Sequence, residues 1–294
     1  MTNDPADASV HLLTSSDVRA LGQQLGLRPT KTLGQNFVTD PGTVRRIVRT
    51  ANIEPGTVVL EVGPGLGSLT LGLLEAGATV VAIEVDPVLA EQLPKTVEQF
   101  APSHADALTV LHADAMEPPE LSASPEVMVS NLPYNVAVPV LLNCLARYAT
   151  LREVLVMVQS EVADRLAAGP GSRTYGVPSA KAAWYAQASR AGSIGRTVFW
   201  PVPNVDSALV RLVRRDNPLT AASRDEVFAV IDAAFSQRRK MLRSALANWA
   251  GSTADAESVL RQAGVEPTER GEKVDIAGFA AIAQARAQRE LQDS

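Results

Sequence analysis

The sequence predicts an α/β domain followed by a small all-helical domain. Between about residues 57 and 212, short aliphatic runs alternate with longer stretches of helical periodicity, which is typical of a largely parallel sheet with crossover helices. Composition changes after Arg215, where Asp216-Asn217-Pro218 indicates a turn or linker. The length of 294 residues leaves room for two domains. We expect a first domain over residues 1–215, with roughly its first 15 residues flexible, and a second over residues 216–294.

Five aliphatic runs predict the strands of the parallel sheet, at residues 58–62, 80–83, 109–111, 127–129 and 154–158. Helical periodicity precedes them at 16–22 and 42–51. A last pair of runs, 196–200 and 208–213, flanks a proline-rich segment. Because proline is poorly tolerated inside a sheet, we expect these two strands to lie antiparallel at one edge.

The second domain is predicted to be helical. Ser223 with Glu226 three residues later has the pattern of a capping box, and apolar residues follow it at helical spacing from Val227 to Phe235. Further helices are expected at 256–263 and 276–291.

Composition limits the kind of protein. Hydrophobic residues make up 46% and charged residues 20%, which is typical of a globular chain. No apolar stretch reaches about 18 residues and no signal peptide is apparent, so we expect a cytoplasmic protein with no membrane contact. The single cysteine, Cys144, lies in an apolar run and is expected to be buried, and no cysteine–histidine cluster indicates a metal site.

A glycine-rich motif follows the first predicted strand: Glu61-Val62-Gly63-Pro64-Gly65-Leu66-Gly67. Glycines there allow a sharp turn and a close approach to a ligand. In the dinucleotide fingerprint G-x-G-x-x-G the third glycine would stand at Ser68, one residue later than it does here. The spacing favours a Rossmann-like methyltransferase site for S-adenosyl-L-methionine over a dinucleotide site, with Gly63 and Gly65 at the cofactor.

Acidic residues follow the next two predicted strands. Glu84 is placed to accept hydrogen bonds from both ribose hydroxyls of an adenosine, and Asp114 to accept one from the adenine amine. The alternative for each is a solvated acid at a strand end. Their recurrence at successive strand ends favours the cofactor.

The fourth strand ends in Asn131-Leu132-Pro133-Tyr134, which indicates the substrate. The exocyclic amine of adenine is a poor nucleophile, because its lone pair is delocalised into the ring. The side-chain carbonyl of Asn131 and the backbone carbonyl of Leu132, accepting its two hydrogens, would draw the nitrogen toward sp³ geometry. Pro133 stiffens this turn and Tyr134 offers a stacking face for an unstacked base. The alternative is a simple turn at the end of a strand.

Together these motifs resemble the ribosomal RNA adenine dimethyltransferase family, specifically its bacterial small-subunit branch, over nearly the whole chain. Leu33-Gly34-Gln35-Asn36-Phe37-Val38 is similar to the family segment that closes over the cofactor, although Val38 replaces a commoner leucine. By position, the resemblance implies a cofactor-contacting set of Asn36, Val38, Gly63, Glu84, Asp114 and Asn131.

The resemblance also implies an activity. It is N6,N6-dimethylation of two adjacent adenines in a hairpin loop near the 3′ end of 16S ribosomal RNA. The expected partner is the assembling 30S subunit, and a monomer fits a partner of that size.

Two further segments, residues 159–166 and 199–208, are similar to the same family. The resemblance implies that Phe199 lies near the target base, where it is either a second stacking face or a core residue.

Basic residues are concentrated in the segment 235–243, although the net charge is −5 and does not by itself favour a nucleic-acid binder. The candidates for RNA binding are Arg238, Arg239, Lys240 and Arg243. Arg173, Lys181, Arg190, Arg211, Arg214 and Arg215 are candidates to extend the patch. Such residues position RNA phosphates, or they form a solvated face.

Three other functions stay open. A large-subunit adenine methyltransferase of the macrolide-resistance type would share the cofactor and strand-four motifs, but segment 235–243 favours the small-subunit branch. A non-enzymatic assembly or transcription factor would keep the fold without needing Asn131-Leu132-Pro133-Tyr134. A nucleotide-dependent oxidoreductase is disfavoured by the glycine spacing.

Overall fold

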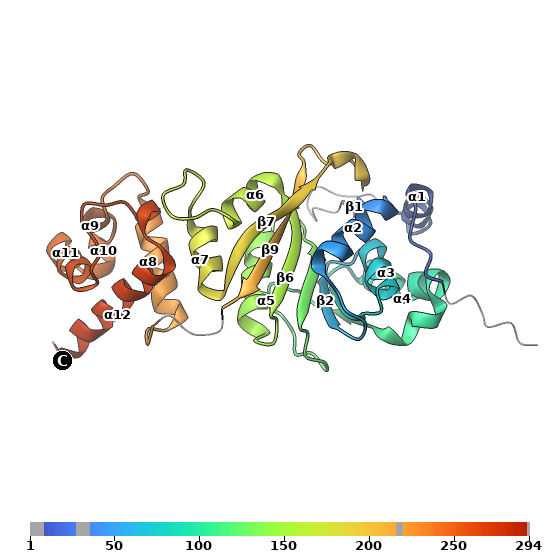
Figure 1. The fold of residues 1–294 in the computed structure, drawn as a ribbon, viewed down its shortest axis with the longest axis horizontal. Helices are drawn as coiled ribbons and strands as arrows, with labels where there is room; N and C mark the ends of the chain where they lie inside the picture. The colour runs from blue at the N-terminus through green and yellow to red at the C-terminus, as the bar shows by residue number, and fades with distance from the viewer. Residues whose placement is uncertain (1–8, 28–35, 216–219, 293–294) are drawn as a thin grey trace, which may run out of the picture. The chain divides into compact units, whose positions relative to one another are not determined.

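The chain forms two compact units in the computed structural model (Figure 1). The structure describes residues 9–27, 36–215 and 220–292. Unit 1 comprises Met1–Ala163 and Arg190–Val213, and unit 2 comprises Asp164–Ser189 and Arg214–Ser294.

The chain passes between the two units more often than the sequence predicts. The sequence predicts a single boundary after Arg215, and the chain does leave unit 1 close to that point. It also leaves unit 1 earlier, so Asp164–Ser189 belongs to unit 2. The physical reason lies in the core of unit 2, where Tyr175 and Ala180 are buried with apolar residues of the C-terminal helices.

The segments expected to be irregular are described only in part. Residues 1–8 and the linker Asp216-Asn217-Pro218 lie outside the described residues. The following stretch at the N-terminus is packed: Leu12 and Leu13 are buried in the core of unit 1. Thr14 then caps helix α1 (Ser15–Gln24) by accepting a hydrogen bond from the backbone N–H of Asp17.

The larger sheet has seven strands in the order β4-β3-β2-β5-β6-β9-β7. Across the sheet they are β4 (Leu108–His112), β3 (Thr79–Glu84), β2 (Val58–Val62), β5 (Val127–Asn131), β6 (Glu153–Gln159), β9 (Ser207–Arg214) and β7 (Ala186–Ile194). The five strands from β4 to β6 run parallel to one another, whereas β9 runs antiparallel to β6. The predicted α/β class and its five parallel strands are confirmed.

The predicted pairing of the last two strands was wrong. β8 (Phe199–Trp200) pairs antiparallel with β1 (Phe37–Val38) in a separate two-stranded sheet. β9 lies inside the larger sheet, between β6 and β7. The proline-rich segment ends β8 after two residues, so it separates these strands instead of joining them as a hairpin.

The strand order reverses between β2 and β5. The chain runs outward from β2 to β3 and β4, and then returns to place β5 on the other side of β2. Near the ends of these two strands, the hydroxyl of Ser130 accepts the N–H of Val62 at 2.8 Å. In open parallel sheets, ligands bind at the carboxyl ends of the strands beside such a reversal.

Four helices of unit 1 precede or connect the parallel strands. α2 (Pro41–Ala51) precedes β2, whereas α3 (Ser68–Glu75), α4 (Pro87–Phe100) and α5 (Ala137–Arg147) each connect one parallel strand to the next. Two of them begin in the same way, with an aspartate cap followed by proline at the first helical position. Asp40 accepts from Thr43 N at 2.7 Å, and Asp86 accepts from Val88 N at 2.9 Å. α2 ends at Asn52, which adopts a left-handed conformation with φ of 49°.

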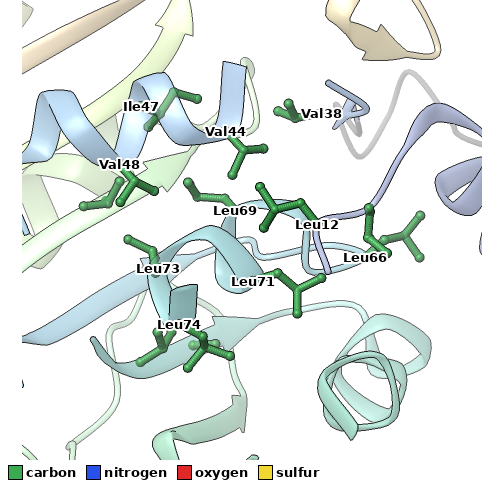
Figure 2. Close-up of a cluster of buried hydrophobic side chains, with 14 of the residues drawn as sticks. Leu12, Val38, Val44, Ile47, Val48, Leu66, Leu69, Leu71, Leu73 and Leu74 are labelled. Atoms are coloured by element: carbon green, nitrogen blue, oxygen red, sulfur yellow. The ribbon is translucent and has the colours of Figure 1, made fainter. Parts of the chain in front are cut away.

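Close packing of α2 on α3 forms much of the aliphatic core beside the sheet. Figure 2 shows Val44 and Val48 on the side of α2 that faces Leu69 and Leu73. Gly72 allows the helices to approach, because a Cβ there would overlap Val44 Cγ1 and lie 3.3 Å from Val48 Cγ2. The scarcity of aromatic residues, 4% of the chain, is consistent with this aliphatic interior.

Among its described residues, unit 2 contains helices and their connecting loops, together with the first residues of β7 and the last residue of β9. After α6 (Ser160–Leu166), which leads into it, its helices are α7 (Val177–Tyr185), α8 (Arg224–Ser236), α9 (Leu242–Ala245), α10 (Ala247–Ala250), α11 (Thr253–Gln262) and α12 (Ile276–Gln292). The predicted capping box of Ser223 and Glu226 is present. Tyr175 and Phe279 contact Phe235 with ring centroids 5.9 and 6.1 Å apart. None of the helices in the described residues is long and apolar enough to span a membrane.

Candidate active site

A cleft opens at the carboxyl ends of β2, β3 and β5, beside the reversal of strand order. It holds about 730 Å³ of empty space, counting the part open to solvent. Most of the predicted site residues line it: Asn36, Val38, Gly63, Gly65, Glu84, Asn131, Leu132, Pro133 and Tyr134. Segments far apart in the sequence therefore meet where parallel α/β sheets bind ligands.

The glycine motif forms a cradle that other residues would fill. Gly63, Gly65 and Gly67 have φ of 68°, 60° and 96°, a conformation that side chains disfavour. A Cβ on Gly65 would lie 2.8 Å from Phe37 Cε1, and one on Gly67 would lie 2.8 Å from Leu93 Cδ1. The turn therefore needs glycine in order to pack against Phe37 and Leu93, and Gly63 and Gly65 line the cleft with backbone alone.

Ser68 explains why the third glycine comes early. Its hydroxyl donates to the carbonyl of Val38 at 2.6 Å, which fastens the start of α3 to β1. A glycine at this position, as in the dinucleotide fingerprint, would lose that bond.

Glu84 lies at the end of β3 with its carboxylate held by backbone donors. Gly65 N–H donates to Oε2 at 3.1 Å and Asp86 N–H donates to Oε1 at 3.0 Å. Burial raises the pKa of Glu84, and these two backbone hydrogen bonds oppose that shift. Each oxygen keeps a second lone pair, so the carboxylate can accept from a pair of neighbouring hydroxyls. These features, together with the glycine cradle, fit the adenosine portion of a nucleoside cofactor.

Asn131 faces the cleft from the end of β5 with a defined amide orientation. Its Nδ2 donates to the backbone carbonyl of Asn36 at 2.9 Å. Because a carbonyl can only accept, the amide nitrogen points toward Asn36 and Oδ1 is left as an acceptor on the other side. The peptide of Leu132 follows at once, fixed by its N–H donating to Met157 O at 3.1 Å.

Tyr134 is anchored at its far end. Its hydroxyl lies 2.6 Å from Ser207 Oγ, and Ser207 is fully buried at the start of β9. Burial raises the pKa of Tyr134, the Ser207 hydrogen bond lowers it, and the charge of Asp206 raises it again. The hydrogen bond restricts the ring to one direction at the mouth of the cleft.

Comparison with known proteins identifies the family of the chain. Residues 27–288 match the family described as ribosomal RNA adenine dimethylase. The chain belongs to that family. The match spans nearly all of both units, so unit 2 is part of the family architecture and not an addition to it.

Similar proteins include two kinds of ribosomal RNA methyltransferase, one named for the small subunit and one for 23S rRNA. A protein of Thermobifida fusca named ribosomal RNA small subunit methyltransferase A is 63% identical over 285 residues, covering 97% of this chain and 99% of the relative. The crystal structure of the 23S rRNA methyltransferase ErmE is 26% identical with a TM-score of 0.61, covering 86% of this chain and 100% of that one. A dimethyladenosine transferase from Plasmodium falciparum has a TM-score of 0.70 at 22% identity, covering 84% of this chain and 95% of that chain, and supports the fold.

Two predicted site residues of this family member do not line the cleft. Asp114 is exposed after β4, and its Oδ1 accepts from Met116 N at 2.8 Å. Phe199 is only 2% exposed and belongs to the hydrophobic core, which is the alternative that the sequence left open. Phe199 is buried because it lies opposite Val38 in the short β1–β8 ladder.

The basic segment divides into paired and unpaired side chains. Arg238 donates to Glu272 Oε2 at 3.2 Å and to Arg173 O at 2.7 Å, and Arg243 lies 3.4 Å from a Glu257 oxygen. Arg239 and Lys240 are exposed, and within the described ranges neither has an ion-pair partner. Two of the four candidates are therefore tied into unit 2 and two project into solvent.

The cleft also contains residues that sequence reasoning did not assign. They are Phe37, Glu61, Pro64, Leu66 and Asp86, among others. Glu61 is 1% exposed, accepts a hydrogen bond from Thr70 Oγ1 at 2.7 Å, and has its pKa raised by burial to about 8. Its place within the glycine motif was the available signal.

Two other sequence expectations concern cysteine and metals. Cys144 is buried, as expected, and burial raises its pKa to about 12. Over residues 9–27, 36–215 and 220–292, no cluster of three or more His, Cys, Asp or Glu is arranged to hold a metal ion.

Proposed function

We propose that this chain transfers methyl groups from S-adenosyl-L-methionine to the N6 amine of adenines in small-subunit ribosomal RNA, forming N6,N6-dimethyladenine. The observation that carries the proposal is the orientation of Asn131, whose Oδ1 is left as an acceptor beside the glycine cradle. Membership of the adenine dimethylase family and the 63% identity to a small-subunit methyltransferase support the same conclusion.

Residues of the cradle would hold the cofactor, which supplies an electrophilic methyl group on a sulfonium. Gly63 and Gly65 admit it close to the backbone, and Glu84 accepts from its ribose hydroxyls. Asn36 and Val38 also line the cleft. Asp114 does not line the cleft. The proposed contact between Asp114 and the adenine of the cofactor therefore rests on the resemblance to the family.

Asn131 and Leu132 would prepare the substrate amine. With its two hydrogens held by Asn131 Oδ1 and the Leu132 carbonyl, the nitrogen lone pair is released from the ring and directed at the methyl group. The amine would take up the methyl group that the cofactor supplies and would then lose one proton to solvent. Pro133 fixes the turn and Tyr134 stacks on the base, so catalysis rests mainly on positioning.

RNA would be held by charge on unit 2. Arg239 and Lys240 are the side chains best suited to phosphates, because they are exposed and carry no ion pair in the described parts of the chain. Arg238 and Arg243 contribute positive charge while stabilising unit 2. Phe199 would act by supporting the cleft wall behind Val38, since its ring is buried.

The substrate would be the assembling 30S subunit, at two adjacent adenines in a hairpin loop near the 3′ end of 16S RNA, with the enzyme acting as a cytoplasmic monomer. The test is methyl transfer from labelled cofactor to small and large ribosomal subunits isolated from cells that lack the enzyme. We expect label in the small subunit alone. Label confined to the large subunit would move the chain to the other branch of adenine methyltransferases.

A further inference from the structure

A second pocket in unit 1 brings together two segments that the proposed reaction leaves without a role. It is lined by Gln159, Ser160 and Glu161 at the end of β6, and by Arg196, Asn204 and Asp206 from the segment before β9. Its cavity has a volume of about 450 Å³ and shares none of the lining residues of the cleft described above. Binding sites of this kind are usually of roughly 300–1,000 Å³.

Hydrogen bonds join the two segments of the pocket and fix the conformation of the second segment. Gln159 lies opposite Ser207 in the antiparallel β6–β9 ladder, and Ser160 N–H donates to Asp206 O at 3.0 Å. Arg196 N–H donates to Asp206 Oδ1 at 3.1 Å. Because one carboxylate oxygen is used to fix the loop, Asp206 has a defined place on the wall.

The second pocket is adjacent to the proposed base-binding residue. Ser207 contacts Tyr134 through its hydroxyl, and it directly follows Asp206. The charge of Asp206 also acts on the pKa of Tyr134, which places that charge close to the phenol. β5 and β6 are parallel neighbours, with Asn131 opposite Met157. Gln159, the last residue of β6, therefore lies at the same carboxyl end of the sheet as Asn131.

Its lining is suited to a nucleobase more than to a second cofactor. Carboxylates and side-chain amides recognise exocyclic amines and ring N–H groups by hydrogen bonds, as they do on exposed base edges in RNA. Arg196 is exposed, and its Nη1 donates to Asn204 O at 3.4 Å. Among the described residues it carries no salt bridge, so its remaining N–H groups are suited to a phosphate. The single aliphatic lining residue is Val205, which is 45% exposed.

We propose that this pocket binds the nucleotide next to the target adenine, with Asp206 and Gln159 accepting hydrogen bonds from an amine-bearing base and Arg196 contacting the linking phosphate. The inference rests on the proposed function, because it assumes that Tyr134 stacks on the target. It makes the pocket a determinant of sequence specificity that lies outside the reacting centre.

The test couples a protein change to an RNA change. Wild type and Asp206→Asn are assayed on unmethylated small subunits, with the base that flanks the pair of target adenines on either side left intact or replaced by uracil, which has no exocyclic amine. Asparagine can still accept from Arg196 N–H, so the loop is retained while an acceptor becomes a donor. Asp106→Asn is the matched control, since Asp106 is exposed and precedes β4 at the opposite edge of the sheet.

With wild type and the Asp106→Asn control, uracil on one side should raise KM for the subunit about tenfold or more, the usual cost of a lost base contact. With Asp206→Asn, KM on the intact subunit should rise by a similar factor, and uracil should then add less than twofold. Cofactor affinity should be unchanged.

Equal sensitivity to uracil in wild type and Asp206→Asn would overturn the proposal. So would insensitivity of wild type to both neighbouring bases, which would leave only phosphate or protein contacts at the pocket. Gln159→Ala repeats the comparison if Asp206→Asn does not fold. A wild-type enzyme that labels no subunit would instead refute the proposed function.

Discussion

Asn131 Nδ2 donates a hydrogen bond to the backbone carbonyl of Asn36 across 2.9 Å, joining two residues 95 positions apart in the chain. The bond decides which end of the Asn131 amide is available to a substrate. Without it, the amide could turn its NH₂ group toward an amine that itself needs acceptors. Asn36, directly before β1, therefore fixes the amide of Asn131 from outside the strand that carries Asn131.

The Tyr134–Ser207 hydrogen bond predicts a non-additive pair of substitutions. Tyr134→Phe keeps the stacking ring and Ser207→Ala keeps the strand, so each removes the same bond. Each should lower kcat by roughly 2- to 10-fold, in line with one hydrogen bond of about 0.5–1.5 kcal/mol. The double variant should be no slower than the slower single variant. Multiplicative losses in single-turnover rates would show that the two hydroxyls act separately.

Gly65 predicts a loss of cofactor binding when a single methyl group is added. In Gly65→Ala the Cβ would sit 2.8 Å from Phe37 Cε1 and force the left-handed backbone to change. Gly56→Ala is the matched control, because Gly56 has φ of 83° and a Cβ added there would meet nothing within 4 Å. Both variants should lose about 1 kcal/mol of stability from backbone strain. Only Gly65→Ala should lose cofactor affinity in calorimetry, and equal affinities would contradict the cradle.

Glu61 predicts a pH-dependent stability. Its pKa is raised to about 8 by burial, so the folded state binds an extra proton between the unfolded pKa near 4.5 and pH 8. Stability should therefore fall as pH rises through that window. Glu61→Gln keeps the acceptor for Thr70 without the titration. The free energy of unfolding, measured with denaturant, should be the same for Glu61→Gln and wild type at pH 4.5. By pH 7 it should be roughly 3 kcal/mol higher for Glu61→Gln. A constant difference between the two proteins would contradict the assignment.

Arg239 and Lys240 predict a change in the salt dependence of RNA binding. Replacing either by alanine should reduce the slope of log K against log salt by about 0.7–1 and leave Tm unchanged. Arg238→Ala should reduce the slope and also cost roughly 0.5–1 kcal/mol of stability, because it breaks the contacts with Glu272 and Arg173. An unchanged slope in Arg239→Ala and Lys240→Ala would place the RNA elsewhere.

Local pattern was enough to predict the parts of the fold with strong periodicity. Each aliphatic run in the parallel sheet became a strand, and the residues following β2, β3 and β5 reached the cleft. β7 was missed because Ala186–Ile194 contains no aliphatic run and is exposed over most of its length. A strand of this kind is specified by its neighbours and not by its own sequence.

The features that could not be predicted from the sequence depend on tertiary contacts. A two-residue strand such as β8 gives no local indication that it pairs with β1, which lies far earlier in the chain at Phe37 and Val38. The burial of Phe199 follows from that pairing. Similarly, nothing in the sequence of Asp164–Ser189 shows that Tyr175 packs in unit 2, where its hydroxyl donates to Val274 O at 2.9 Å.

In the proposed reaction, Asn131 directs methyl transfer to the adenine amine. Nucleoside mass spectrometry of small-subunit RNA, after reaction with wild type or Asn131→Ala, tests it most directly. Wild type should produce N6,N6-dimethyladenosine. Asn131→Ala should form at least about 10²–10³-fold less, the cost of removing a group positioned at a reacting centre, while cofactor binding remains measurable. Undiminished N6,N6-dimethyladenosine from Asn131→Ala, or wild-type product methylated at another atom, would contradict the account.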